Sequence, residues 1–227
     1  MGKYLGLADY SVAAAMSSVL CGNGRLMKRP MSRCVHFLCQ AFVLSPLAFS
    51  CVSAQAHAGS AQGWLHPLTG PDHLLAMIAV GAWSAQIGGR AIWVVPSAFV
   101  CCMAAGGIAG FYQLDIPGIE SAVAISVLVL GLAIGCARKL AMAPAACMVG
   151  LFGVCHGYAH GYEMPVMDNK VTYVAGFLTS TATLHLIGAV GAWRLLQRPL
   201  GALALRGAGF ACAIVGAALT YMALTTA

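Results

Sequence analysis

Charged side chains are scarce in this sequence: Asp, Glu, Lys and Arg make up only 8% of its 227 residues. Soluble domains carry roughly a quarter of such residues, so this scarcity excludes an ordinary soluble domain. Hydrophobic residues account for 60% of the chain. At about 20 residues per membrane-spanning helix, the length suits one bundle of about six spans. The composition therefore predicts an all-α, polytopic membrane helix bundle with the lipid bilayer as its solvent.

Several motifs that would indicate other functions are missing. No G-x-x-x-x-G-K-[ST] segment occurs, so a nucleotide-driven motor is not expected. The 10 cysteines include no C-x-x-C pair, and those in the apolar stretches are interpreted as small packing residues rather than a disulfide framework. The net charge of +6 comes from basic residues in short loops and not from a patch interleaved with aromatics. Nucleic acid is therefore not a predicted partner.

The N-terminal part of the chain has the pattern of a cleavable signal peptide. A short basic segment precedes an apolar run over residues 34–52, and an A-x-A cleavage site follows at 54–56. A signal normally begins at its own methionine, so translation is interpreted as starting at Met27 or Met31. Cleavage would leave His57 as the mature amino terminus. The chain is therefore divided into an unassigned extension (1–26), a signal peptide (27–56) and a membrane domain (57–227).

Basic residues recur in every second loop between the apolar stretches, which predicts the orientation of the bundle. Such loops remain on the cytoplasmic side, so both mature termini are expected on the periplasmic side of a bacterial inner membrane. Glycines within the spans favour close helix packing. The expected spans are 72–89, 91–111, 117–137, 140–161, 171–193 and 207–225, and the basic loops carry Arg90; Arg138 and Lys139; Arg194, Arg198 and Arg206.

The first span begins in a segment crowded with polar and helix-breaking residues, HPLTGPDH. Thr69 three residues before Asp72 predicts a capping box, and Pro71 suits a first helical position. The helix is therefore expected to begin near Asp72, with His66 in an irregular segment before it. Within the helix, His73 is one turn before a methionine.

These residues form a ligand set for a divalent metal ion. His73 and Met77 share one helix face at i, i+4, close to Asp72 and His66. Imidazole, carboxylate and thioether groups suit a borderline-soft divalent cation. Each residue has a plainer interpretation, because a histidine at a span end often packs at the interface, an aspartate caps its helix, and a methionine fills the core.

The fourth span ends at the same predicted side of the membrane with a second group of ligand types. His156, His160 and Glu163 follow one another at i, i+4 and i+7, so they form one stripe on a helix. Glu120 begins the third span, also on the outer side. Ionisable groups in spans are costly and tend to mark ion pathways. Their coincidence at one depth favours a metal site over separate packing or solvated roles.

A polar track continues along the fifth span. His185 lies past the middle of this span, and Thr181 precedes it by one turn on the same face. Ser126 in the third span is a further candidate for lining the track. The alternative is that these hydroxyls bond to backbone carbonyls and that His185 joins two helices. Both interpretations remain open from the sequence.

The motifs together resemble the HupE/UreJ family of nickel and cobalt permeases. HPLTGPDHLLAM is similar to that family's HPxxGxDHxxxM signature, CHGYAHGYE to its HGxAHGxE segment, and PGIESAVAISVLVLGL to its third span. The resemblance covers roughly residues 50–227. It implies metal-handling roles for His66, Asp72, His73, Met77, His156, His160 and Glu163, while Glu120 and His185 are added by position and His57 as a collecting residue at the mature terminus.

The expected function is facilitated uptake of Ni²⁺ or Co²⁺, which would supply metalloenzyme maturation such as that of hydrogenase or urease. The protein is then not an enzyme and has no resident cofactor, because the ion is its cargo. The main alternative is an intramembrane zinc-dependent hydrolase with Glu163 or Asp72 as base. A haem-binding electron carrier is a third interpretation. The sequence leaves open whether the protein forms a homo-oligomer.

Overall fold

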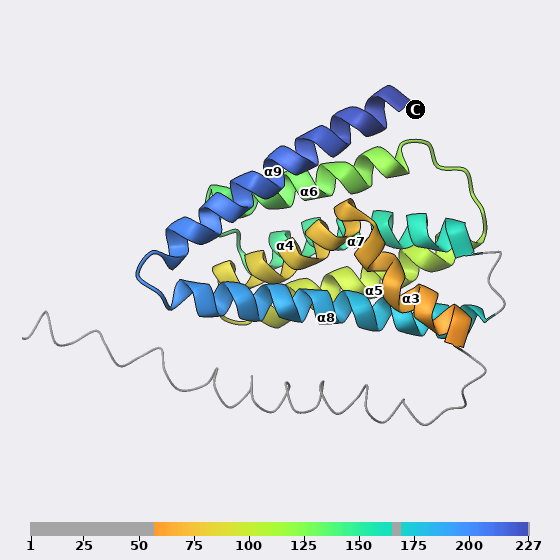
Figure 1. The fold of residues 1–227 in the computed structure, drawn as a ribbon, viewed down its shortest axis with the longest axis horizontal. Coiled ribbons are helices and arrows are strands. Elements are labelled where there is room, and N and C mark those ends of the chain that lie inside the picture. The colour runs from red at the N-terminus through yellow and green to blue at the C-terminus, as the bar shows by residue number, and fades with distance from the viewer. Residues whose placement is uncertain (1–56, 165–168, 227) are drawn as a thin grey trace, which may run out of the picture. The chain divides into compact units, whose positions relative to one another are not determined.

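The computed structural model describes residues 57–164 and 169–226, and these residues form seven α-helices and no strand. The predicted all-α class is confirmed. Residues 1–26 and the predicted signal peptide at 27–56 lie outside the described residues. The helices, shown in Figure 1, are α3 (His57–Thr69), α4 (Pro71–Ile87), α5 (Ala91–Phe111), α6 (Ile119–Gly135), α7 (Met142–Glu163), α8 (Lys170–Leu196) and α9 (Gly201–Thr226).

Six of these helices, α4 to α9, coincide with the six expected spans to within a few residues, except that α9 begins earlier. Four of them, α5, α7, α8 and α9, are long and apolar enough to cross a membrane. Helices α4 and α6 have 17 residues each. At about 1.5 Å per residue, such a helix measures about 25 Å, slightly less than a hydrocarbon core of about 30 Å. The chain is therefore an all-helical membrane protein.

Helix α3 was not expected, and it corrects the prediction for His66. This histidine lies in the last turn of α3 rather than in an irregular segment, and Pro67 is inside the same helix. The predicted capping box is also wrong. The Thr69 hydroxyl donates to the carbonyl of His66 at 2.8 Å, and Gly70 takes the N-cap position with an extended backbone. Pro71 does begin α4, as predicted.

The spans associate mainly in three pairs: α5 with α7, α6 with α9, and α4 with α8. Figure 1 shows α9 lying along α6 on one side of the bundle, away from α8. Glycines make these pairings close. A Cβ at Gly157 of α7 would collide with the Met103 carbonyl of α5, and one at Gly188 of α8 would collide with the Ile78 carbonyl of α4. Small residues serve this purpose where lipid provides no hydrophobic driving force between helices.

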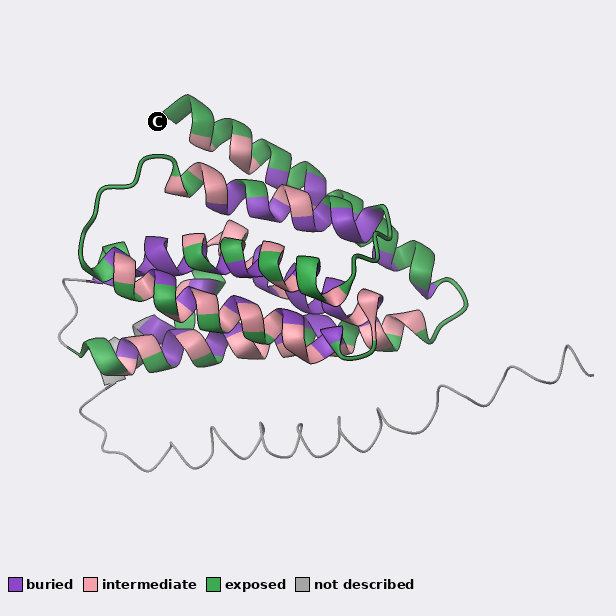
Figure 2. Cartoon of the chain, turned by 180° about the vertical axis from the view of Figure 1, so that it is seen from behind, coloured by how far each residue is buried: buried purple, intermediate pink, exposed green. Residues whose placement is uncertain are grey.

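The apolar core lies among α4, α5, α6, α7 and α8, whereas α9 is mostly exposed along its length (Figure 2). Met77, Trp83 and Phe99 are fully buried in this core. On α9 large apolar side chains such as Ile214 point outward, which in a membrane is the expected lipid-facing surface.

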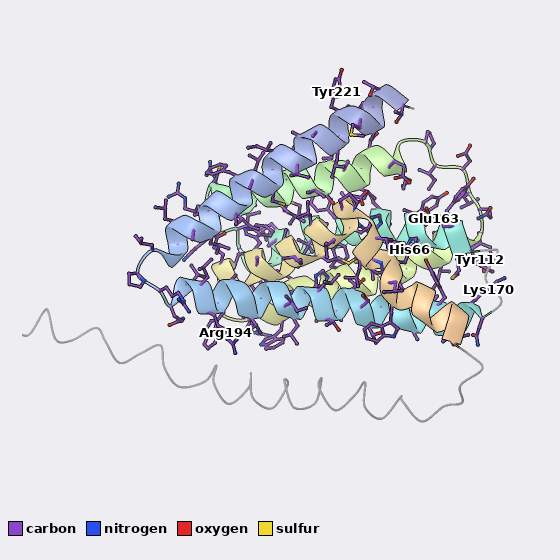
Figure 3. The ribbon with its side chains drawn as sticks, viewed as in Figure 1. His66, Tyr112, Glu163, Lys170, Arg194 and Tyr221 are labelled. Carbon is purple, nitrogen blue, oxygen red and sulfur yellow. The ribbon has the colours of Figure 1, made fainter. Side chains whose placement is uncertain are left out.

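The loops that carry the basic residues gather at one end of the bundle. Arg206 Nε donates to the Gly135 carbonyl at 3.0 Å, and Trp83 Nε1 donates to the Arg138 carbonyl at 2.8 Å. These bonds bring the start of α9 and the end of α4 to the loop after α6. Figure 3 shows Arg194 toward this end, and His66, Glu163, Tyr112 and Lys170 toward the opposite one. We call the two ends the basic end and the histidine end.

Candidate metal-ion site

Four histidines from three helices are in ring contact at the histidine end. His160 of α7 lies 4.7 Å from His66 of α3 and 4.2 Å from His73 of α4, measured between ring centroids. His73 is in turn 4.8 Å from His156, one turn earlier on α7. We call His66, His73, His156 and His160 the histidine cluster. Residues that are distant in sequence therefore meet as the metal-site hypothesis requires.

Helix α7 carries two buried histidines, and its glycines bring it against α5. His156 is 0% exposed and His160 is 3% exposed. Gly157 and Gly161, each adjacent to a histidine, lie directly on the backbone of α5. The predicted i, i+4 placement of the histidines on one face is thus observed. The third member of the stripe, Glu163, lies at the exposed end of the helix.

Protein oxygen atoms fix which nitrogen of His73 and His156 is free. His73 Nδ1 lies 2.8 Å from the Asp72 carboxylate, so it donates its proton there and leaves Nε2 as the lone pair. Ser126 donates its hydroxyl proton to the Val123 carbonyl at 2.6 Å. Its oxygen must then accept from His156 Nε2, 2.9 Å away, which leaves His156 Nδ1 as the lone pair. Neither free nitrogen has a hydrogen-bond partner among the described residues.

His160 and His66 complete the cluster near its exposed side. Both ring nitrogens of His160 are buried and without a partner in the described part of the chain. His66 Nε2 lies 3.0 Å from a Glu163 carboxylate oxygen. His66, His160 and Glu163 each have one donor atom within 4.8 Å of the other two. Donor atoms this close together could bind a single cation. Buried polar atoms are normally paired, so several imidazole nitrogens without a partner among the described residues make this a candidate ligand site.

The chemistry of the cluster suits a divalent transition metal ion. Imidazole nitrogens favour nickel, cobalt, copper or zinc, and the two carboxylates beside them offset positive charge. The other ring nitrogen of a metal-binding histidine usually donates to a carboxylate, a carbonyl or water, which orients the ring. Asp72 takes this role for His73, and Ser126 provides an equivalent acceptor for His156.

His185 lies deeper and apart from the cluster. Its Nδ1 donates to the Met77 carbonyl at 2.7 Å, and its Nε2 is buried without a partner among the residues described. Met77 is fully buried, and it bonds to His185 through its backbone oxygen rather than its thioether. The ring of Phe99 lies 4.9 Å from His185 and 5.4 Å from His156.

Glu120 is not brought into the cluster, and the prediction for His57 concerns a side chain outside the described residues. Glu120 lies in the first turn of α6 and is exposed, and no ion pair or hydrogen bond to the histidines is found for it within 57–164 and 169–226. His57 is the first residue of α3, and its side chain lies outside the description. Sequence position predicted only the side of the membrane on which Glu120 lies, and this does not determine which residues it contacts.

Aromatic residues that the sequence analysis did not single out surround the cluster. Phe177 lies 4.1 Å from His160, and Tyr173 lies 6.1 Å from His66. Phe177 is eight residues before His185 on the same face of α8, so helical periodicity could have found it. An apolar cavity of about 570 Å³ between α5, α7 and α8 also reaches His160.

The apolar helical bundle, with buried imidazoles that have no partner among the described residues, defines a membrane protein with a candidate site for a divalent metal ion. A family profile described as "HupE / UreJ protein" matches residues 39–219, and the chain belongs to this family. The chain is 43% identical over 179 residues to Protein HupE of Rhizobium leguminosarum bv. viciae, covering 79% of this chain and 93% of that protein. No solved structure matches it. The resemblance stated from the motifs is thereby confirmed.

Proposed function

We propose that this protein is a permease that mediates facilitated uptake of Ni²⁺ or Co²⁺ across the bacterial inner membrane. The observation that carries the proposal is the histidine cluster, in which the free nitrogens of His73, His156 and His160 are buried, unpartnered among the described residues and in adjacent rings. Membership of the HupE/UreJ family supports the same cargo. The imported ion would serve the maturation of a metalloenzyme such as hydrogenase or urease.

In the proposed orientation, the histidine end faces the periplasm together with both mature termini. The clustering of basic loops at the opposite end supports this arrangement, because such loops stay in the cytoplasm. A divalent cation that moves inward along an inside-negative potential gains about 4.6 kcal/mol per 100 mV, at about 2.3 kcal/mol per charge. Uptake in this direction therefore needs no nucleotide hydrolysis.

The exposure of the cluster suggests the order of contact. The His66 and Glu163 side chains are 35% and 58% exposed, whereas His73 is only 12% exposed. An arriving ion would meet the exposed pair first, with His57 as a collecting residue, and would exchange water for the buried imidazoles in steps. Several weakly shared ligands favour transfer over storage, because a conducting site must also release its ion.

The hydrolase alternative is not favoured by the family assignment. We propose instead that the chain is not an enzyme and that the metal is its substrate. A hydrolase would retain zinc stoichiometrically through chelator washing, whereas a permease site exchanges its ion readily. Metal content before and after such a wash therefore separates the two proposals.

The decisive test is uptake of radiolabelled Ni²⁺ and Co²⁺ into proteoliposomes with an inside-negative potential. The intact chain should accumulate both ions, while His73→Ala and His156→Ala should reduce uptake to the level of protein-free vesicles. Glu120→Gln is the matched control, because Glu120 is predicted on the same side but lies outside the cluster. Equal uptake by the intact chain and both histidine variants would disprove the proposal.

A further inference from the structure

One apolar ring interrupts the series of donor groups that runs into the bundle. Ring contacts of 4.2–4.8 Å link the members of the histidine cluster to one another. Beyond His156 the series continues through Phe99, at 5.4 Å, and then to His185, at 4.9 Å from Phe99. Phe99 thus lies between two histidines in this series, and its side chain has no atom that can bind a metal ion.

A second pair of unpartnered polar groups lies on the far side of Phe99. His185 is 2% exposed and Thr181 is 0% exposed, and they are one turn apart on α8. Because His185 Nδ1 donates to the Met77 carbonyl, its Nε2 holds the lone pair. Neither that nitrogen nor the Thr181 hydroxyl has a partner within the described residues. We call His185 and Thr181 the inner pair.

Phe99 is buried between the two groups. It is fully buried, and the backbone carbonyl of Phe99 lies against Gly153, where α7 packs on α5. An apolar ring in a narrow passage excludes water and therefore a hydrated ion. The Phe99 ring lies between His156 and His185, so an ion that followed this series of rings to the inner pair would have to displace it.

We propose that Phe99 is an apolar gate that separates the histidine cluster from the inner pair, and that the inner pair is the second position which the transported ion occupies. This inference rests on the proposed permease function for the transport step. The barrier itself is a property of the packing, so it can be tested without transport.

The first experiment measures access to the inner pair with diethyl pyrocarbonate, which modifies imidazole nitrogens. The full chain in lipid nanodiscs is treated, and modification of each histidine is followed by mass spectrometry. Phe99→Ala should accelerate modification of His185 several-fold and leave His66 unchanged. Phe99→Leu, which keeps an apolar side chain of closer size, should keep His185 protected. Leu130→Ala controls for the loss of a fully buried side chain elsewhere in the core.

The second experiment measures Ni²⁺ flux and equilibrium Ni²⁺ binding for the same variants. Phe99→Ala should raise the flux several-fold with an unchanged affinity of the histidine cluster. The gate is disproved if His185 is modified at the same rate in Phe99→Ala as in the intact chain. It is also disproved if Leu130→Ala accelerates this modification as much as Phe99→Ala does. If the intact chain carries no ion but Phe99→Ala exposes His185, the barrier stands and the permease proposal fails. If the intact chain transports Ni²⁺ and Phe99→Ala alters neither access nor flux, the permease proposal stands and the gate fails.

Discussion

The two ends of the bundle differ in how their buried polar side chains are used, although Gln86 Oε1 at the basic end also lacks a partner among the described residues. At the basic end, the N–H groups of Trp83, Gln86 and Arg206 each donate to a backbone carbonyl of the α6 C-terminus or the residues just after it. At the histidine end, the donors of the His73 and His156 rings are likewise bonded, but their lone pairs point to no partner among the described residues. The first arrangement holds helices together. The second leaves binding capacity unused by the fold.

This difference separates residues that stabilise the protein from residues that bind its cargo. A buried polar atom left without any partner costs about 1–3 kcal/mol, so a ligand on the imidazoles that lack one among the described residues would stabilise the fold. The basic end carries no comparable group of free imidazoles among the described residues. Substitutions at the two ends should therefore change different measured quantities.

The largest expected effect on stability is at the basic end. Trp83→Ala removes a fully buried indole and its bond to the Arg138 carbonyl. It should lower the free energy of unfolding by about 3–5 kcal/mol and leave the Ni²⁺ affinity of the folded fraction unchanged. His160→Ala should show the reverse, with little change in stability and loss of Ni²⁺ binding. Thermal unfolding in detergent and titration calorimetry measure the two quantities. A similar loss of affinity in both variants would abolish the distinction between the ends.

An intermediate effect is expected from a buried hydroxyl that sets the tautomer of a histidine. Ser126→Ala removes the acceptor of His156 Nε2–H. Loss of such an orienting partner typically weakens metal binding by about 10–100-fold. Ser126→Thr, which keeps the hydroxyl, should retain most of the affinity when Ni²⁺ binding is titrated.

Ser84, in the last turn of α4 near the basic end, offers a matched control for this prediction. Like Ser126, it is 0% exposed and its hydroxyl donates to the carbonyl three residues earlier. Within the described residues, its hydroxyl makes no hydrogen bond to a histidine. Ser84→Ala should therefore leave Ni²⁺ affinity unchanged. An equal loss of affinity in Ser84→Ala and Ser126→Ala would mean that Ser126 acts only through packing.

The sequence predicted the helices well because hydropathy and length determine them directly. It also placed His156 and His160 on one face, since helical spacing alone requires that. It could not place His66, because the extra helix α3 depends on packing against α8 through Gly63. The choice of Thr69 as a cap failed for a related reason, since its hydroxyl bonds back into α3. Phe99 carried no signal, because an apolar residue in an apolar span looks like any other.

Two of the acidic residues predicted on the outer side, Glu163 and Glu120, differ in a way that only the fold could reveal. Glu163 contacts His66 at 3.0 Å, whereas Glu120 is exposed at the start of α6. Both carboxylates are solvent-accessible, so their effects should be the smallest considered. Glu163→Gln removes an anionic donor oxygen from the site, and a loss of about 1–2 kcal/mol corresponds to a reduction of Ni²⁺ affinity of about 5–30-fold. Glu120→Gln should keep the Ni²⁺ affinity of the intact chain. This outcome is expected if the ion is attracted by a carboxylate in contact with the cluster and not simply by negative charge at the histidine end. Equal reductions in the two variants, both relieved by high salt, would instead assign the attraction to long-range charge, because salt screens such interactions beyond about 10 Å at 0.1 M.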